Sequence, residues 1–578
     1  MRKGDRAFFK VRLKLTYTTY VNNFSQCVLL APKVARPALN WSGSRGKIRM
    51  GSKSLSIGVH YEPSGVDPHI GSAELALQMT NAVFDTLVHR LPDGTYLPGL
   101  AEHFDISPDG CVYTFKLRRD VQFHDGTPFN ALAAAFSLRR AHDPRNKSQL
   151  AGGMLGPYRG SRAIDELTLQ VELTAPYAML LDALSQGWLA PVSPRAVETL
   201  GPAFSRRPVG TGPFVFDRWT PGDRIVLKRN DAYRWGPPTV ANDGPARLGE
   251  IVFVFLPDED ERSAALESGA VDVVFCLPPA TATRLRHDER FIVETVPIRG
   301  VPVCLMMNTA RAPTNDLRVR QAINFAIDQD ALVNTIFGGE FARAYGPVSQ
   351  FTLGYSQAVE DRYPCDLDAA RRLLNEAGWD STGRDGVRTK CGERLRLRFL
   401  ALPVNHYPEF GAILSEQLRK VGIEVEVVVL PPLDWIRAGK RGEHHLIPQG
   451  KYGSSSQLMG FVYHSRYSSG DGYGWSKRTA SHRPGFDDLL ERGERAFDVG
   501  EFVPLYSEAQ EIVMDEALIA PLHCNTNIVA TRAGVRGIAF DAIGAYPLFH
   551  DTDTNAVSGK GILSGANVAT RENTANGP

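Results

Sequence analysis

Long apolar runs are missing from this chain of 578 residues. A membrane-spanning helix needs about 20 consecutive apolar residues, and no segment reaches that length. An excess of one charge is missing as well, since 65 Lys and Arg residues stand against 64 Asp and Glu residues. A neutral balance gives no electrostatic reason to expect a nucleic acid or an anionic membrane as partner. The composition therefore favours neither a transmembrane nor a nucleic-acid-binding protein.

Cysteine is scarce and scattered, which argues against a metal or redox site. The seven cysteines form no C-x-x-C pair and show no metal-ligand spacing. Cys365 and Cys391 flank one loop-rich stretch and could form a disulfide in an oxidising compartment, although free, half-buried thiols are the expected state. We expect no metal and no cofactor.

The first residues carry the basic start of a signal peptide without its apolar core. Arg2, Lys3 and Arg6 suit such a start, but the apolar stretch from Cys27 to Ala31 is shorter than the roughly 7–15 residues of a secretory leader. Residues 1–54 are therefore a degenerate leader, a disordered extension, or upstream sequence ahead of a true start at Met50. The sequence leaves these three alternatives open.

The remaining chain is too long for one hydrophobic core, so we expect two or three domains. Strands and helices alternate along it, which predicts α/β lobes with mostly parallel sheets. Residues 449–485, rich in Gly, Ser, Tyr and His, are expected to form a long loop, and long ordered loops are usually functional. Strands are expected at 55–59, 113–117, 167–173, 251–256, 271–275, 395–400, 425–430, 518–530 and 535–540. Helices are expected at 73–90, 131–141, 258–269, 318–337, 366–377, 408–421 and 501–516.

No motif assembles a catalytic site. His444 and His445 lack the helical spacing of zinc ligands, and the glycine-rich stretch 470–474 does not open a helix after a strand. No G-x-S-x-G elbow and no cysteine nucleophile pattern is present. His124 and Asp125 are better explained by a hairpin turn than by acid–base chemistry. The sequence therefore predicts no enzyme.

Several strings follow one another in a fixed order and together resemble a known family. The set begins with Asn81-Ala-Val-Phe-Asp-Thr-Leu87, Ser107-Pro-Asp-Gly110, Val121-Gln-Phe-His-Asp-Gly-Thr-Pro-Phe-Asn130, Pro208-Val-Gly-Thr-Gly-Pro-Phe214, Leu266-Glu-Ser-Gly-Ala-Val-Asp272, Met307-Asn-Thr309 and Val319-Arg-Gln-Ala-Ile323. These strings are similar to those of the extracellular solute-binding proteins of the oligopeptide, dipeptide and nickel ABC importers, over about residues 55–545.

Most of these strings are interpreted as scaffold. Gly210 and Gly212 are expected to supply backbone conformations that a side chain would forbid. Arg320 and Asp328, on one predicted helix, are expected to form a structural salt bridge inside the second lobe.

The resemblance implies a two-lobed α/β fold of the periplasmic-binding-protein kind (type II, with an extra subdomain), with mixed sheets flanked by helices and a ligand cleft between the lobes. The implied limits are lobe I at 55–302 with its subdomain at about 76–204, lobe II at 303–522, a return to lobe I at 523–556, and a tail at 557–578. The implied protein is a periplasmic monomer that binds a small-molecule or peptide-like solute and delivers it to an inner-membrane ABC permease.

The ligand-binding region departs from the peptide-binding members. These carry an Asp that pairs with the peptide ammonium, whereas the corresponding region here reads Gln449-Gly-Lys-Tyr-Gly453 and continues without that Asp. A buried ammonium without a carboxylate costs several kcal/mol, so we hypothesise that ordinary peptides are not preferred over opine-like or sugar-conjugate-like solutes. The candidate ligand-binding residues are Tyr61, Glu62, His406, Tyr407, Tyr452, His464, Arg466, Asp471 and Trp475.

Two other functions remain alternatives. A cytoplasmic ligand sensor with the same fold would explain the missing export signal, although residues 1–49 show no two-helix DNA-binding pattern. A hydrolase would need a pocket with coupled titrating groups, for which the sequence gives no sign.

Overall fold

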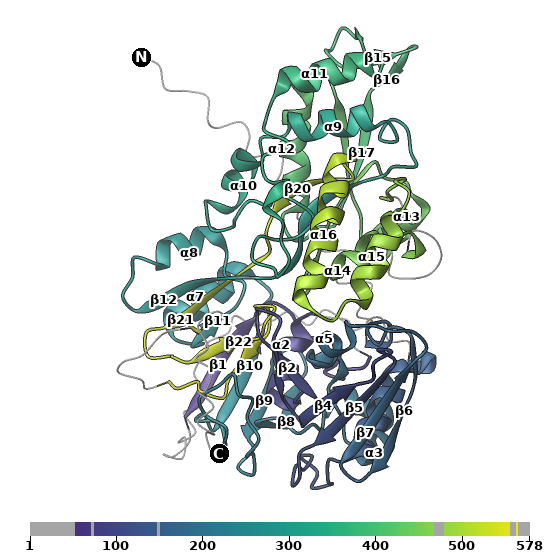
Figure 1. Cartoon of the computed structure of the whole chain (residues 1–578). Helices are drawn as coiled ribbons and strands as arrows, with labels where there is room; N and C mark the ends of the chain where they lie inside the picture. Colours follow the sequence, from purple (N-terminus) through teal and green to yellow (C-terminus); the bar gives the residue numbers. More distant parts are fainter. Residues whose placement is uncertain (1–52, 71–73, 147–150, 468–478, 555–561, 564–578) are drawn as a thin grey trace. The chain divides into compact units, whose positions relative to one another are not determined.

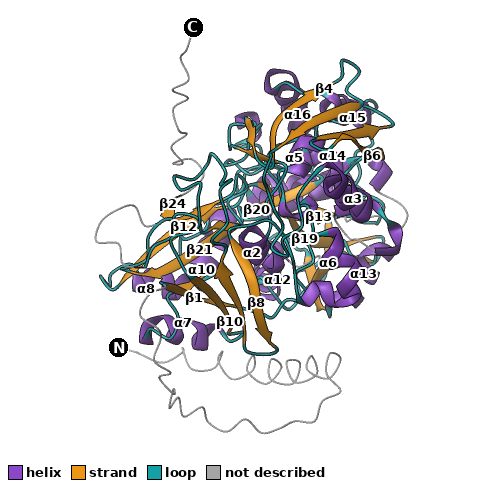
Figure 2. Ribbon diagram, turned by 90° about the horizontal axis from the view of Figure 1, so that it is seen from below, coloured by secondary structure: helices purple, strands orange, loops and turns teal. Residues whose placement is uncertain are grey.

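The computed structural model describes residues 53–70, 74–146, 151–467, 479–554 and 562–563. A seven-stranded mixed sheet has the strand order β12-β21-β11-β1-β10-β9-β8 (Figures 1 and 2). The central strand β1 runs parallel to β10 and β11, whereas the other neighbours are antiparallel. The strands are β1 (Ser54–Val59), β8 (Phe214–Thr220), β9 (Arg224–Arg229), β10 (Glu250–Phe255), β11 (Val273–Val274), β12 (Phe291–Pro297) and β21 (Thr526–Arg532).

A four-stranded antiparallel sheet of order β4-β5-β7-β6 follows β1 in the chain, and helix α3 packs on β6 and β7. We call the seven-stranded sheet, this sheet and their helices the first lobe. Its remaining elements are α2 (Glu74–Val83), β2 (Val88–Arg90), β3 (Tyr96–Pro98), β4 (Ala101–Ile106), β5 (Val112–Leu117), α3 (Ala131–His142), α4 (Ala151–Met154), β6 (Tyr158–Asp165), β7 (Thr168–Leu173), α5 (Leu180–Leu184), α6 (Pro194–Leu200), α7 (Glu259–Ser268), α8 (Pro279–Leu285), β22 (Ile538–Phe540), β23 (Pro547–Leu548) and β24 (Ile562–Leu563).

A five-stranded mixed sheet of order β18-β17-β19-β13-β20 forms the centre of what we call the second lobe. Helices α14, α15 and α16 lie together against it (Figure 1). Its elements are β13 (Gly300–Met307), α9 (Leu317–Ala326), α10 (Gln329–Phe337), α11 (Leu367–Glu376), β14 (Ser381–Thr382), β15 (Arg388–Lys390), β16 (Glu393–Arg394), β17 (Arg396–Ala401), α12 (Tyr407–Arg419), β18 (Glu424–Val429), α13 (Pro432–Arg441), β19 (Leu446–Tyr452), α14 (Leu458–Tyr463), α15 (Phe486–Arg495), α16 (Val499–Asp515) and β20 (Ile519–His523).

The chain passes between the two larger sheets twice, from β12 to β13 and from β20 to β21. The two passages touch, because the backbone N–H of Ile298 donates to the carbonyl of Asn525 at 2.9 Å. Gly300 starts the first strand beyond the passage with φ 128°, and a Cβ there would lie 2.1 Å from the carbonyl oxygen of Lys451. Glycine is thus required where the strands meet.

Local signals predicted many elements well. Helix α7 begins after Asp258, whose side chain accepts from the N–H of Glu261, and ends at Gly269 with φ 80°, as the N-cap and C-cap residues predicted. Both large sheets are mixed, as the resemblance implied, so the prediction of mostly parallel sheets from the alternation of strands and helices was wrong. The expected loop at 449–485 also contains the end of β19 and helix α14, and it runs into the start of α15.

The expected helix at 318–337 is two helices, α9 and α10, separated at Ile327 and Asp328. Asp328 caps α10, and its side chain accepts from the N–H of Ala331. Arg320 is buried and donates to three backbone carbonyls, including that of Glu516 at 2.8 Å. The predicted salt bridge between Arg320 and Asp328 was therefore wrong, because the helix breaks between them.

Cys365 and Cys391 are free and exposed rather than half-buried. In the part of the chain that the structure describes, no helix is long and apolar enough to cross a bilayer.

Gly212 shows why this fold needs glycine at a close approach. Its φ lies outside the left-handed region, contrary to the expectation of a special backbone conformation, but a Cβ would lie 2.5 Å from the carbonyl carbon of Val83 at the end of α2. The three nearest atoms all belong to the backbone of residues 82–84, so no flexible side chain can move aside.

We expect Gly212→Ala to lower the free energy of unfolding by about 1–3 kcal/mol, the usual cost of overpacking. Urea unfolding followed by circular dichroism measures the change. Gly160→Ala is the matched control, since a Cβ there meets nothing within 4 Å. Equal unfolding midpoints for the two variants would show that the contact with α2 is not tight.

Candidate functional site

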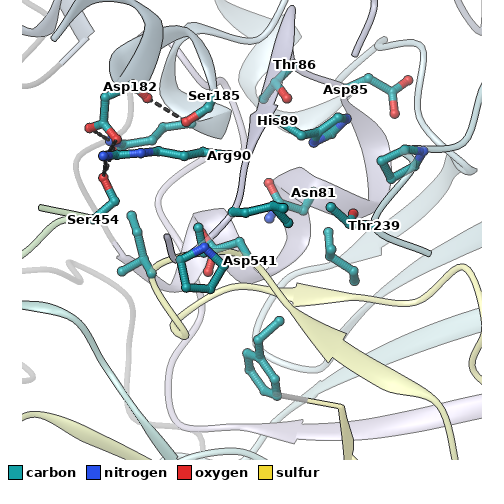
Figure 3. Close-up of a pocket in the computed structure, with 18 of the residues that line it drawn as sticks. Asn81, Asp85, Thr86, His89, Arg90, Asp182, Ser185, Thr239, Ser454 and Asp541 are labelled. Atoms are coloured by element: carbon teal, nitrogen blue, oxygen red, sulfur yellow. Dashed lines mark hydrogen bonds and ion pairs between the residues drawn. The ribbon is translucent and has the colours of Figure 1, made fainter. Parts of the chain in front are cut away.

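A cavity of about 60 Å³ lies where the two lobes meet (Figure 3). Most of its wall comes from residues 81–92, from α5 with the residues just after it, and from residues 540–550, all in the first lobe, and the second lobe contributes Ser454. Roughly four or five water-sized groups fit such a volume. The cavity can therefore enclose a small group in this conformation, but not a whole peptide.

Arg90 and Asp182 form a buried ion pair in this wall. Nη1 of Arg90 lies 2.5 Å from Oδ1 of Asp182, and their side chains are 3% and 8% exposed. Burial lowers the pKa of Arg90, but the charge of Asp182 outweighs it and keeps the pKa above its usual value. Ser454 of the second lobe hydrogen-bonds both partners (Figure 3). The pair thus ties the lobes together.

A second polar contact joins the lobes near this pair. The backbone N–H of Ala178 donates to the carbonyl of Glu494, at the end of α15, at 2.9 Å. Tyr452 at the end of β19 packs against the hydrophobic cluster of the first lobe that includes Ile543 and Tyr546. The two lobes therefore contact each other directly beside the cavity.

A buried hydrogen-bond network surrounds Asp85 on another side of the cavity. Its carboxylate accepts from the hydroxyls of Thr211 and Tyr233 at 2.8 Å each and from the indole N–H of Trp235 at 2.9 Å. Burial raises the pKa of Asp85, while the three donors oppose that rise. The Tyr233 hydroxyl also lies 3.3 Å from Nε2 of His550. Both carboxylate oxygens therefore accept hydrogen bonds from inside the protein, which favours a positioning role for Asp85.

The predicted residues Tyr61 and Glu62 lie after β1 in the first lobe. Glu62 accepts from the indole N–H of Trp219 at 2.8 Å, from the backbone N–H of Gly222 at 2.9 Å and from Arg206 at 3.1 Å. Tyr61 packs edge to face on His60. The carboxylate thus ties a loop to the β8–β9 hairpin.

The predicted residues His406 and Tyr407 lie at the start of α12 in the second lobe. The ring of His406 meets Phe337 edge to face at 5.6 Å, and Tyr407 is 7% exposed in the core of that lobe. His464 and Arg466 follow α14. Nε2 of His464 lies 3.2 Å from Glu491, and Arg466 pairs with the buried Glu494.

Asp471 and Trp475 lie outside the described residues. The other predicted residues form separate groups, and none of them is among the described residues that line the cavity. Tyr452 and Arg466 come nearest to the lobe contact, through the first-lobe cluster and through Glu494. The predicted ligand set stays a prediction.

Sequence reasoning missed the charged residues that do line the cavity, namely Asp85, Arg90, Asp182 and Asp541. Asp85 belongs to a string that was interpreted as scaffold. The other three carry no motif and are brought together from distant parts of the chain. No group of three or more His, Cys, Asp or Glu among the described residues could hold a metal ion.

Comparisons with known proteins agree with this architecture. Residues 95–473 match the family described as bacterial extracellular solute-binding proteins, family 5 Middle. The chain is 26% identical over 525 residues to the dipeptide-binding protein of Escherichia coli (strain K12), which covers 86% of this chain and 94% of that protein. It is 27% identical over 485 residues to the glutathione-binding protein GsiB of Shigella flexneri, covering 82% of this chain and 89% of that protein.

Solved structures of other proteins are also similar to this chain. NikA from Brucella suis in complex with Fe(III)-EDTA superposes with a TM-score of 0.76 at 25% identity, covering 87% of this chain and 100% of that chain. AgaA from A. tumefacien R10 in complex with agropinic acid superposes with a TM-score of 0.70 at 25% identity, covering 87% and 99%.

Fold and cavity define a two-lobed α/β binding protein. The chain belongs to the family 5 extracellular solute-binding proteins. As a member of that family it is the solute-binding component of an ABC importer, and the binding proteins of this family are not enzymes. The resemblance inferred from the ordered strings is confirmed.

The Arg90–Asp182 pair gives a stability prediction. We expect Asp182→Asn to lower the free energy of unfolding by about 3–5 kcal/mol, because it leaves the buried guanidinium of Arg90 without a counter-ion. Urea unfolding measures this, and Asp434→Asn is the control, since Asp434 and Arg437 form an exposed pair worth about 0–1 kcal/mol. Equal losses in the two variants would contradict the prediction, and the double variant Arg90→Met/Asp182→Leu should recover stability.

Proposed function

We propose that this protein captures its solute at the cavity bounded by Arg90, Asp182, Ser454 and Asp541 and releases it unchanged to a membrane permease. The supporting observation is that both lobes contribute to the wall, since Ser454 belongs to the second lobe and the other three to the first. Closure is favoured by a solute only if the solute binds the closed state better than the open one. A solute touching both lobes meets that condition.

The proposed lobe limits remain 55–302 for lobe I with its subdomain at about 76–204, 303–522 for lobe II and 523–556 for the return. They are supported by the two passages between the sheets, at 297–300 and 523–526. Two short passages that touch through the Ile298–Asn525 hydrogen bond suit a hinge.

The class of solute follows from the polar groups near the lobe contact. The second lobe offers the buried hydroxyls of Ser454, Ser455 and Ser456 and no carboxylate in that string. Asp541, however, brings a carboxylate to the cavity from the return segment. The hypothesis that ordinary peptides are disfavoured therefore loses its premise, and peptide-like, opine-like and sugar-conjugate-like solutes all remain within the proposal. Among the ligand-binding residues predicted from the sequence, Tyr452 and Arg466 lie nearest to the lobe contact and are the best candidates to bind part of the solute.

A thermal-shift panel of di- and tripeptides, glutathione and agropinic acid tests the proposal. A solute bound only by the folded state adds about 2.7 kcal/mol of stability at a hundredfold excess over Kd. We expect at least one member to raise the melting temperature of the wild type.

Ser185→Trp should abolish that rise because Ser185 lines the cavity and the indole would fill it. The control is Ser268→Trp, which changes an exposed residue at the end of α7 and should leave the rise intact. A full shift in Ser185→Trp would place the solute elsewhere.

We further propose that the protein works as a monomer on the outer side of the inner membrane and meets the membrane only through its permease. Family membership supports this, since the matching family is described as extracellular. Fractionation of the native host should find the protein in the periplasmic fraction. Recovery with the cytoplasmic fraction would favour a ligand sensor instead.

A further inference from the structure

The cavity wall carries more negative than positive charge. It contains three carboxylates, those of Asp85, Asp182 and Asp541, against the single guanidinium of Arg90. Arg90 and Asp182 neutralise each other at 2.5 Å. The two histidines in the wall add no charge at neutral pH, because burial lowers the pKa of His89 to about 4 and that of His550 to about 3. The remaining charge is therefore negative.

Asp541 is the carboxylate without a cationic partner in direct contact. Its Oδ1 accepts the backbone N–H groups of Gly544, Ala545 and Tyr546 at 3.1–3.2 Å. Within the described ranges Asp541 forms no ion pair, and the neighbouring Arg299 donates to the carbonyl of Ala542 instead. Burial raises the pKa of Asp541 to about 6, and the three N–H groups only partly oppose that rise. The negative charge is thus incompletely compensated by the protein.

Three buried polar atoms of the wall have no partner among the described residues: Nδ1 of His550, the hydroxyl of Thr239 and one donor, Nε of Arg90. The Tyr233 hydroxyl donates its proton to Asp85, which leaves the Tyr233 oxygen to accept, and we assign the N–H of His550 to Nε2 on that ground. A neutral imidazole carries one N–H, which leaves Nδ1 of His550 as an acceptor. Nδ1 is buried without a partner among the described residues, on a side chain 2% exposed, and so is the hydroxyl of Thr239 in the same wall. Buried polar atoms are nearly always hydrogen-bonded, so Nδ1 of His550 calls for a donor, and the Thr239 hydroxyl can accept from the same group.

We propose that the cavity receives a primary ammonium group of the transported solute, with the Asp541 carboxylate as its counter-ion and Nδ1 of His550 as an acceptor. This inference rests on the proposed function and adds the chemical group that is recognised. An ammonium has three donors and no acceptor, which matches a wall rich in acceptors and negative charge. The cavity holds roughly four or five water-sized groups, so it takes the charged end of a solute.

Position in the fold makes this site different from one in the second lobe. Asp541 follows β22 in the return segment, whereas the missing Asp of the peptide-binding pattern would lie in the second lobe after β19. An anionic group in the cavity would meet Asp541 with like charge. The same contact therefore selects against solutes that present a carboxylate or phosphate here.

Isothermal titration calorimetry with matched probes tests the inference. The probes are Gly-Gly, Ala-Ala, glutathione and putrescine, each paired with its fully N-acetylated form (the N,N′-diacetyl compound for putrescine), and the proteins are the wild type, Asp541→Asn and Asp434→Asn. The Asn side chain keeps an oxygen for the three backbone N–H groups and removes only the charge, and a thermal melt confirms folding. Asp434 is exposed on α13 and serves as the matched control.

We expect amine-bearing probes to bind the wild type and Asp434→Asn alike, and acetylation to weaken binding. Asp541→Asn should raise Kd for the amines at least about 30-fold, which corresponds to the lower end of the loss when one partner of a buried charge pair is removed. Its Kd for the acetylated probes should stay unchanged.

Affinity of the wild type for the amines should also fall as pH drops through about 6, because protonation neutralises Asp541 while the ammonium stays charged. The other titratable or charged groups near Asp541 are Arg299 beside it and Asp85, His89, Arg90, Asp182 and His550 in the cavity wall. The fall should vanish in Asp541→Asn, which separates Asp541 from these neighbours.

Unchanged amine affinity in Asp541→Asn would overturn the inference, and so would failure of every amine-bearing probe to bind the wild type. Binding of acetylated probes in that second case would leave the proposed function standing. If no probe binds, native mass spectrometry of the purified protein for a retained solute decides the proposed function separately.

Discussion

The guanidinium of Arg90 is buried between the carboxylate of Asp182 and the hydroxyl of Ser454. Burying an ion pair removes two charges from water, and the attraction between them offsets that loss only when the surrounding hydrogen bonds are also made. One of those hydrogen bonds comes from the other lobe. The closed arrangement of the lobes therefore depends on a contact that is complete only when β19 and the loop after it lie against the first lobe.

The two passages of chain between the sheets make such a contact reversible. They are short, they touch through the Ile298–Asn525 hydrogen bond, and the elements on each side have their own hydrophobic clusters. Each lobe can thus keep its packing while the angle between them changes. A solute that forms additional contacts in the cavity would favour the closed state. The shift is set by how much more tightly the solute binds the closed state than the open one. Release without chemistry follows from reopening.

Sequence reasoning succeeded where the signal was local or where several strings agreed. The caps of α7 at Asp258 and Gly269 follow from side-chain and backbone preferences within a few residues. Sequence reasoning failed where the conformation of one or two residues ended a helix that the pattern predicted to continue. A single helix was expected over α9 and α10, but Ile327 takes an extended conformation and Asp328 starts a new helix, so Arg320 faces backbone carbonyls instead of Asp328.

The candidate site was the least predictable part for a related reason. Glu62 and His464 have side chains of the right chemistry next to strand or helix ends, yet both are engaged by neighbours within their own lobe. Nothing in the local sequence around Asp182 or Asp541 distinguishes a cavity carboxylate from an ordinary surface one. Their importance comes from what surrounds them.

The sequence by itself determined the class of the protein, because strings in a fixed order and the alternation of strands and helices are properties of neighbouring residues. Only the tertiary structure decided which charges share the cavity. The cavity residues Arg90, Asp182, Ser454 and Asp541 come from distant parts of the sequence. Both large sheets, and therefore both lobes, must be folded before these four residues meet. Burial then sets their ionisation and pairing, since the energy of a charge depends on the groups around it rather than on its neighbours along the chain.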